Sequence, residues 1–546
     1  MMSGMSPTKR SSIFWLILCV VVGIAGSGWA APSDRSFFKK RKAPVAKPSV
    51  TTSTKKIYSG PVVPLAQIDQ LTLPLKHGSI KETFDAGQNR PIIVHIQDAH
   101  ANYVAQKHLS SLLEYLILKH ELSLVLVEGG SRNDSLSYMR SYAPLEKRLQ
   151  VADEFLKAGK ISGENYLDLT TDYEFTVYGI EKPELYDANM AAFLKVEQAQ
   201  PVAKKGIANY HTAVERLKER IYPEPVKELE REEAQVAENQ VPLTTHYEHL
   251  AEVATTQQIA LPTYPNFQQF LRVSQLEKKI NFKQVETERG KVLRELSKVL
   301  PKDEMEDFLK RSRQVKRGTA TASSFYRALY AKLSEEQKSK YEELSAYCRY
   351  LASYDEIEHS KLFSEVEHLA DTVKHSYFSK KDQKTLAQIA KDVAILGDLV
   401  ELKLIPEKHE YYVAHRRAFD PARWGKQLTA LGKKAQVTIP EFDPGVLKAA
   451  VPPVEEFYDV ARQRDLAMVE NALKQIKAFE VDLAVLISGG FHTPVIADLL
   501  KKHKISFAVV APKVPPVTEA DIELYHKVLK ETYVPMAPQH QTDEGQ

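Results

Sequence analysis

The chain has 546 residues, of which 43% are hydrophobic and 27% are charged, which is the composition of an ordinary globular protein. A chain of this length buries a full hydrophobic core without needing disulfides or metal ions to stabilise it. Its formal charge of +3 is small and its basic residues are dispersed, so we expect no nucleic-acid partner. It contains no P-loop, no GxGxxG turn and no CxxC pair, so nucleotide-binding and zinc-ribbon functions lack support.

Residues 1–30 have the pattern of a secretory signal peptide. Lys9 and Arg10 precede an apolar run, IFWLILCVVVGIAG, and small residues follow it up to Ala30. The run is shorter than the roughly 20 apolar residues of a membrane-spanning helix, so we expect membrane attachment only if this segment stays uncleaved as an anchor. The pattern therefore predicts an exported protein, either periplasmic or at the cell surface or secreted.

The next residues divide into a linker and a first α/β segment. Residues 31–60 are basic, rich in Ser, Thr, Pro and Lys, and without hydrophobic periodicity, which predicts a disordered linker. Within residues 61–185 the pattern alternates between strand and helix, as in α/β proteins. Buried strands are expected over three short segments, 91–96, 122–127 and 175–180. An amphipathic helix is expected over 102–119.

Residues 186–440 differ, because they are charged, poor in glycine and apolar at every third or fourth position. This pattern predicts an insertion of several helices that caps the α/β part, with breaks where proline follows Tyr222 and Leu261. The α/β pattern returns in residues 441–533, and residues 534–546 are expected to be a flexible tail. The predicted fold is therefore α/β, with a mostly parallel sheet made of two strand-helix-strand halves and split by a long all-helical insertion.

Imidazole and carboxylate side chains follow the expected strands at the points where those strands end. Asp98 and His100 follow the first strand, Glu128 the second, Glu181 the third, and His492 a strand of the second half. In an open α/β sheet, ligands bind at the carboxyl ends of the parallel strands. Such side chains bind zinc, manganese, iron or cobalt, and without a metal the same groups can act as acid and base on a water molecule.

Each of these residues also has an ordinary structural explanation. Asp98 could cap the following helix, Glu128 could be a turn residue, and Gly489–Gly490 could serve only a tight turn. His95 lies between apolar residues inside its strand, which favours a core histidine over a ligand. The similarity of the two strand ends IQDAH and SGGFH, far apart in the chain, favours a shared site.

These motifs resemble those of the TraB/Tiki superfamily, which includes the erythromycin esterase-like and ChaN-like proteins. Its members carry Gly-x-x-His or Gly-Glu-x-His after the first strand, a Glu after the next, and a second Gly-x-x-His late in the chain. The segment GGFH, ending at His492, matches the late motif in full. The segment QDAH, ending at His100, matches the early motif with Gln97 in place of Gly and Asp98 in place of Glu, and Glu128 matches the strand-end Glu.

Two further segments are similar to those of the family. VYGIEKPEL is like its Gly-x-Glu segment and points to Glu181, and RQRDLAMVENAL is like the helix that carries Arg in TraB-like proteins and points to Arg464. The resemblance is confined to residues 90–185 and 455–512.

The resemblance implies a hydrolase, because the superfamily includes metal-dependent peptidases and macrolide-lactone hydrolases, together with a haem-binding lipoprotein. We expect a peptide or small-molecule ester substrate and either a divalent ion (Mn, Co, Zn or Fe) held by His100, His492 and Glu181, or His100 and His492 acting as acid and base groups. Glu128 is expected as a ligand or the general base. Asp98, with Glu181, is expected to orient these groups or complete the ligand shell, and Arg464 to stabilise negative charge. The alternatives are a non-catalytic haem- or metal-binding protein of the ChaN-like kind, and a helical interaction scaffold.

Overall fold

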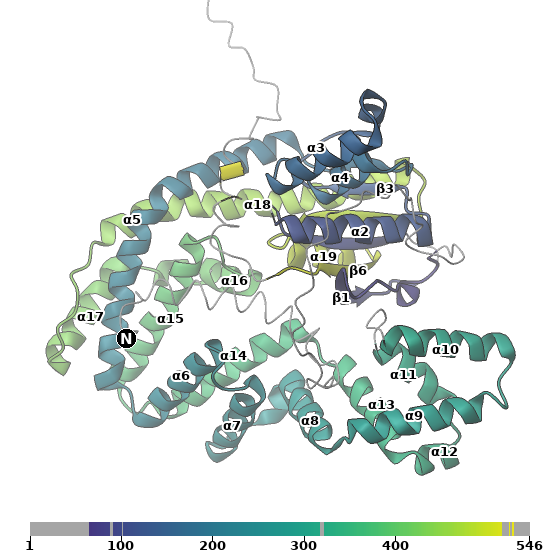
Figure 1. The fold of residues 1–546 in the computed structure, drawn as a ribbon. Helices are drawn as coiled ribbons and strands as arrows, with labels where there is room; N and C mark the ends of the chain where they lie inside the picture. Colours follow the sequence, from purple (N-terminus) through teal and green to yellow (C-terminus); the bar gives the residue numbers. More distant parts are fainter. Residues whose placement is uncertain are drawn as a thin grey trace, which may run out of the picture. The chain divides into compact units, whose positions relative to one another are not determined.

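The computed structural model describes residues 65–87, 91–100, 102–316, 322–515, 524 and 527–528 (Figure 1). The expected signal peptide, linker and tail lie outside these residues. In the part of the chain described, no helix is both long and apolar enough to cross a membrane. The chain divides into two compact units, a helical unit formed by Ala191–Tyr458 and an α/β unit formed by the residues up to Met190 and from Asp459 onward.

The α/β unit is built on a six-stranded sheet in the order β1-β6-β2-β5-β3-β4 among the described residues. All neighbouring strands pair in parallel except β1, which runs antiparallel to β6 at one edge. The predicted mostly parallel α/β sheet is confirmed, and β1 is a strand that the sequence pattern did not predict. The strands are β1 Gly78–Phe84, β2 Ile92–Asp98, β3 Leu124–Val127, β4 Thr176–Gly179, β5 Leu483–Gly489 and β6 Ser506–Pro512.

The two strand-helix-strand halves interleave within this one sheet. Strand β5, from the late part of the chain, lies between β2 and β3, and β6 lies on the other side of β2. In the parallel pairing of β2 with β5, Ile92 is opposite Leu483 and Asp98 is opposite Gly489. The ends of these two strands, which are far apart in the sequence, are therefore neighbours in space.

Helices cover both faces of the sheet (Figure 1). On one face, α2 (Tyr103–His120) packs its leucines against alternate residues of β2 and β5, such as Val94 and Val485. On the other face, the last turns of α18 (Pro444–Ala478) and all of α19 (Thr493–Lys502) pack against the intervening residues, such as Leu486. This alternation follows from the two-residue period of a strand, and burial on both faces explains the continuous apolar runs of β2 and β5. The remaining short elements of this unit are η1 Ile68–Gln70, η2 Ser137–Tyr142, α3 Leu145–Lys157 and α4 Gly163–Thr170.

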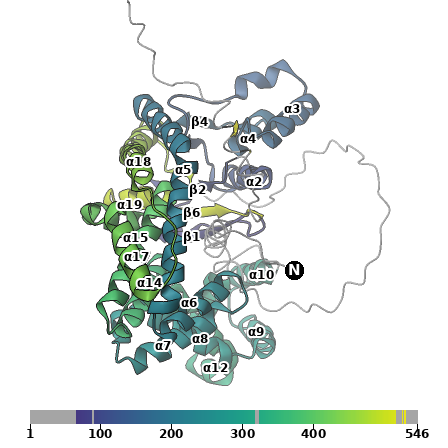
Figure 2. The same cartoon turned by 90° about the vertical axis from the view of Figure 1, so that its left-hand side faces the viewer.

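The helical unit contains helices and turns throughout its described residues, as the spacing of its apolar residues predicts (Figure 2). The expected proline breaks are present, since α5 ends at Ile221 and the short helix η3 begins at Leu261. Both limits of the unit fall inside long helices, α5 and α18, and the second limit, at Tyr458, comes later than residue 440. The helices are α5 Pro183–Ile221, α6 Glu224–Ala237, α7 Leu243–Thr256, η3 Leu261–Thr263, α8 Pro265–Lys279, α9 Phe282–Leu296, α10 Lys302–Lys316, α11 Ala322–Ala331, α12 Glu335–Lys340, α13 Glu342–Asp355, α14 His359–Ser376, α15 Lys381–Val400, α16 Pro406–Ala414, η4 Arg416–Ala418, α17 Pro421–Ala435 and the start of α18.

Gly179, the last residue of β4, packs against the backbone of the turn that follows β3. A Cβ atom at Gly179 would lie 1.9 Å from the carbonyl carbon of Gly130 and 2.3 Å from its oxygen. We predict that Gly179→Ala lowers the free energy of unfolding by about 3 kcal/mol or more, because backbone rather than a flexible side chain must move. Urea unfolding followed by circular dichroism measures this change.

Gly290→Ala is the control for that substitution. Gly290 lies in α9, where an added Cβ meets no atom within 4 Å, and alanine favours a helix by about 1 kcal/mol over glycine. This variant is expected to be as stable as the wild type or slightly more stable. Equal stability of Gly179→Ala and the wild type would contradict the close packing of Gly179 against the turn that follows β3.

Candidate functional site

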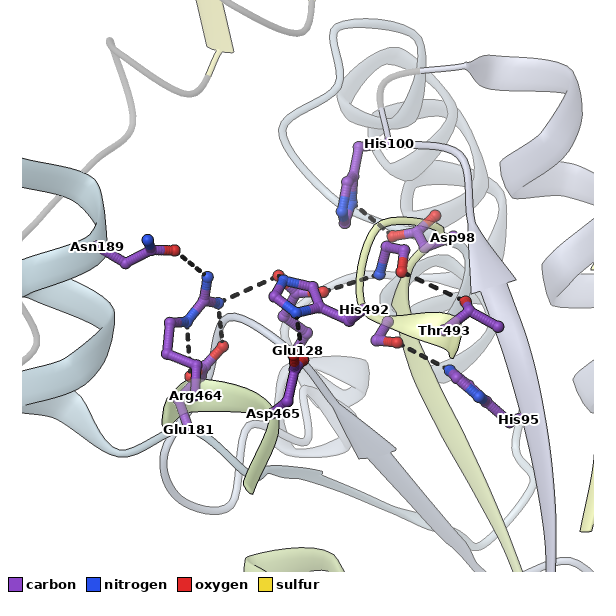
Figure 3. Close-up of polar contacts among 12 residues, drawn as sticks. His95, Asp98, His100, Glu128, Glu181, Asn189, Arg464, Asp465, His492 and Thr493 are labelled. Carbon is purple, nitrogen blue, oxygen red and sulfur yellow. Dashed lines mark hydrogen bonds and ion pairs between the residues drawn. The ribbon is translucent and has the colours of Figure 1, made fainter. Parts of the chain in front are cut away.

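The expected site residues meet at the carboxyl edge of the sheet, where β2 and β5 lie side by side (Figure 3). After β2 the chain enters α2 on one face of the sheet, and after β5 it enters α19 on the opposite face. Adjacent parallel strands whose connections leave toward opposite faces create a crevice at their carboxyl ends, which is the usual ligand position in open α/β sheets. The structure thus brings all six predicted residues to one region of the α/β unit.

His492 is a buried imidazole held between two carboxylates. Its Nδ1 lies 2.6 Å from Oδ1 of Asp465, and its Nε2 lies 3.3 Å from Oε1 of Glu128 (Figure 3). Burial disfavours the charged ring, but Glu128 and Asp465 together outweigh it and raise the pKa of His492 to about 10. At neutral pH this residue is therefore an imidazolium whose two N–H groups both face carboxylates.

Glu128 lies at the centre of the arrangement, with both of its carboxylate oxygens in contact with donors. Oε1 accepts a hydrogen bond from Nη2 of Arg464 at 3.1 Å, and Oε2 accepts one from the backbone N–H of Gly489 at 2.8 Å. Burial opposes ionisation, but His492 and Arg464 hold the pKa of Glu128 well below its usual range. Glu128 is thus a fixed anion and a weak base, and it is more than the ordinary turn residue considered above.

Arg464 is buried, with its side chain only 7% exposed, and it has partners at all three guanidinium nitrogens. Nε and Nη2 donate to the two oxygens of Glu181, and Nη1 donates to Oδ1 of Asn189 at 2.7 Å. The neighbouring carboxylates also raise the pKa of Arg464 above its ordinary value. This arrangement favours a positioning role for Arg464, which fixes Glu128 and Glu181, over the direct stabilisation of substrate charge expected from the sequence.

His100 forms a second Asp–His pair on the other side of the crevice. Its Nδ1 lies 2.6 Å from Oδ2 of Asp98, and Oδ1 of Asp98 accepts a hydrogen bond of 2.5 Å from Nε2 of Gln106. The cap of helix α2 is Asn102, so the capping role considered for Asp98 is wrong. Asp98 overcomes the effect of burial and raises the pKa of His100 to about 9, although the side chain of His100 is 39% exposed.

The absence of a side chain at Gly489 leaves a small space between the two halves of the site. A Cβ atom there would lie 3.4 Å from Nε2 of His100 and 3.6 Å from Oε2 of Glu128. Neither Gly489 nor Gly490 has a positive φ angle, so a tight turn alone does not require these glycines. Nε2 of His100 and Oε2 of Glu128 therefore both border the small space beside Gly489, which has room for one methyl group.

His95 is a buried core histidine, as its position inside the strand predicts. Its Nε2 lies 2.8 Å from Oγ of Ser488, whereas its Nδ1 has no hydrogen-bond partner among the described residues. Burial, helped by the positive charge of His492, lowers the pKa of His95 to about 3. It is therefore neutral at physiological pH and lies beneath the site.

The predicted metal ligands do not fit a shared ion in this arrangement. Among the described residues, no three side chains of His, Cys, Asp or Glu are grouped so that they could hold a metal ion. The reason is visible in their partners, since His492 faces Glu128 and Asp465, and both oxygens of Glu181 accept from Arg464. We therefore assign no catalytic step to a metal.

Three supporting residues were not predicted from the sequence. Asp465 fixes His492, Gln106 fixes Asp98, and Asn189 fixes Arg464. Asp465 follows Arg464 directly in the segment RQRDLAMVENAL, so its place beside the predicted Arg464 was a signal that could have revealed it. Gln106 and Asn189 lie on helices whose packing determines their role, and nothing in the local sequence marks them.

Comparisons of the chain with models of protein families, with curated proteins and with solved structures found no match. The resemblance to the TraB/Tiki superfamily therefore depends on the motifs alone, and it remains an expectation.

The charge state of His492 gives a direct test of this geometry. Its folded pKa of about 10 lies above the ordinary 6.5, so its ion pairs stabilise the fold fully below about pH 6.5 and this contribution is lost as pH rises through about 10. We predict that Asp465→Asn lowers the titration midpoint of His492 by one pH unit or more, about 1.4 kcal/mol per unit. An NMR titration that follows the histidine ring signals measures this shift. His503, an exposed residue after α19, is the internal reference. A wild-type midpoint near 6.5 would contradict the buried ion pairs.

Proposed function

We propose that this edge of the sheet is the active centre of a hydrolase that cleaves a peptide or ester bond with His100 as general base. The observation that carries the proposal is the position of His100, whose Nδ1 is held by Asp98 while its Nε2 faces the space at Gly489. An imidazole oriented by a carboxylate, with its second nitrogen directed at the reacting atoms, is the arrangement that hydrolases use to activate a nucleophile. The motifs shared with the TraB/Tiki superfamily support the same class of reaction.

The proposed reaction begins with a water molecule in the space at Gly489. Nε2 of His100 takes a proton from this water as its oxygen attacks the substrate carbonyl carbon, and Asp98 stabilises the imidazolium that forms. The carbonyl π electrons move to the oxygen and return when the bond to the leaving amine or alcohol breaks. His100 then gives its proton to that leaving group, and the products are a carboxylic acid and an amine or alcohol.

Glu128 has a different role from the base expected from the sequence. Its low pKa makes it a poor proton acceptor, but its Oε2 borders the same space as His100. We assign it the orientation of the attacking water by a hydrogen bond, while Arg464 and His492 keep the carboxylate fixed and charged. Preorganised charges of this kind need no rearrangement during the reaction.

Three predictions from the sequence stay proposals beside this mechanism. The exported location depends on residues outside those described. The role of the helical unit as a cap over the substrate is likewise a proposal from the sequence. The non-catalytic alternative, a ChaN-like haem- or metal-binding protein, is distinguished by metal analysis and by the Soret absorption after haem addition. Bound haem or metal together with no turnover of ester or peptide probes would overturn the hydrolase proposal.

Replacement of the proposed base is the first test. We predict that His100→Ala lowers kcat/KM for a chromogenic ester or peptide anilide by about 10²–10⁴-fold, the usual contribution of general-base catalysis. The melting temperature should change little, because the ring is partly exposed. His503→Ala, which removes an exposed histidine, is the matched control and should keep full activity. Retained activity in His100→Ala would contradict the proposal, and loss of wild-type activity after EDTA dialysis would show that a metal is required.

The pH dependence of kcat/KM is the second test, because it reports the free enzyme. Only the neutral form of His100 accepts a proton, so we expect kcat/KM to rise about tenfold per pH unit and to level off near the pKa of about 9. Asp98→Asn should move this midpoint toward the ordinary 6.5 while lowering the plateau, since the ring loses its orienting partner. A rate that falls as the pH rises toward 9 would mean that His100 acts as an acid.

A further inference from the structure

A further carboxyl group, Glu164, acts on the Asp98–His100 pair, and no arginine or lysine among the described residues pairs with it. It is the second residue of α4 and is only 5% exposed. Its Oε1 accepts a hydrogen bond from Oγ of Ser162, and its Oε2 is buried with no hydrogen-bond partner among the described residues. A buried carboxylate without compensation is costly, so the environment favours the protonated acid.

The start of α4 is fixed to Asp98 through one bridging side chain. Gln106 donates from Nε2 to Asp98 and accepts at Oε1 from the backbone N–H of Gly163 at 2.7 Å. The contact is close, because a Cβ atom at Gly163 would lie 2.4 Å from the carbonyl oxygen of Gln106. Glu164 is the next residue after Gly163, which is linked to Asp98 by two hydrogen bonds through Gln106, and it cannot move away without breaking this packing.

The other charged side chains on the elements around α4 have partners of their own. Asp98 and His100 are therefore the charged groups that influence the ionisation of Glu164. Lys107 of α2 lies over the ring of Tyr166, and the two nearest arginines bind other acceptors on α4. Those arginines are Arg140 of η2, which pairs with Asp168, and Arg148 of α3, which donates to the carbonyl oxygen of Leu169. Burial is the main cause that raises the pKa of Glu164 to about 7, and the negative charge of Asp98 adds to it. The positive charge of His100 acts in the opposite direction.

We propose, on the basis of the function proposed above, that Glu164 is a positioning residue that controls how readily His100 accepts a proton. While Glu164 keeps its own proton, Asp98 and Glu128 are the carboxylates that favour the charged form of His100. Once Glu164 loses its proton, a further negative charge stabilises the imidazolium, and a smaller fraction of His100 is available as base. Glu164 therefore delays the gain in activity as the pH rises above neutral.

The test compares the wild type with Glu164→Gln, which removes the charge but keeps the shape. Its matched control is Glu146→Gln, since Glu146 is also the second residue of its helix, α3, but is exposed. We expect Glu164→Gln to lower the midpoint of the kcat/KM profile by about half a pH unit or more, the effect of one charge at short range. The NMR titration midpoint of His100 should fall by the same amount. Glu146→Gln should change neither midpoint.

The NMR measurement separates this inference from the proposed reaction, because it needs no substrate. An unchanged His100 midpoint in a folded Glu164→Gln protein would overturn the role of Glu164, whatever the activity. A shifted midpoint in a protein without hydrolytic activity would instead keep the coupling and overturn the hydrolase proposal. If Glu164→Gln does not fold, ¹³C NMR of labelled glutamate in the wild type decides the matter. Because burial also raises the pKa of Glu277 to about 7, the spectrum is recorded in Glu277→Gln. A glutamate carboxyl group that still titrates near neutral pH is expected, and its absence would contradict the inference.

Discussion

The parallel pairing of β2 with β5 is the constraint on which the site depends. This register places Asp98 opposite Gly489, so the histidine turn after one strand faces a residue without a side chain on the other. A slip of one residue would reverse the side chains of a strand and send its site residues to the wrong face. Because β5 lies between β2 and β3, the sheet cannot be completed until the chain on both sides of the helical unit is present. Site formation and completion of the fold are therefore one event.

The buried charges of the site are stable only as a set. Glu128, Glu181 and Asp465 are carboxyl groups whose ion-pair partners are the guanidinium of Arg464 and the imidazolium of His492. Removing either cation leaves buried carboxyl groups without their partner, and breaking a buried ion pair in this way costs about 3–5 kcal/mol in measured cases. The same set gives the candidate site a fixed electrostatic field, because its members are held by one another rather than by solvent.

The sequence predicted the elements that have a simple periodic signal. The buried strands β2 to β6 appear as short apolar runs, and the rule that ligands bind at strand ends located Asp98, His100, Glu128, Glu181 and His492. Strand β1 was missed because it is a half-exposed edge strand of mixed composition, GSIKETF. The order of the strands, and the roles of Gln106 and Glu164, depend on contacts between distant segments. A single sequence carries no local signal for such contacts.

The two Asp–His pairs show why matching motifs do not imply matching roles. His492 is buried with a carboxylate at each ring nitrogen, whereas His100 is partly exposed and directs Nε2 toward the space at Gly489. Gln97, the first residue of the segment QDAH, is an ordinary residue of β2 paired with Ser488, and Gly489 of the neighbouring strand lies opposite Asp98. The two turns therefore contribute different groups, since β5 supplies the glycine and β2 supplies the partly exposed imidazole.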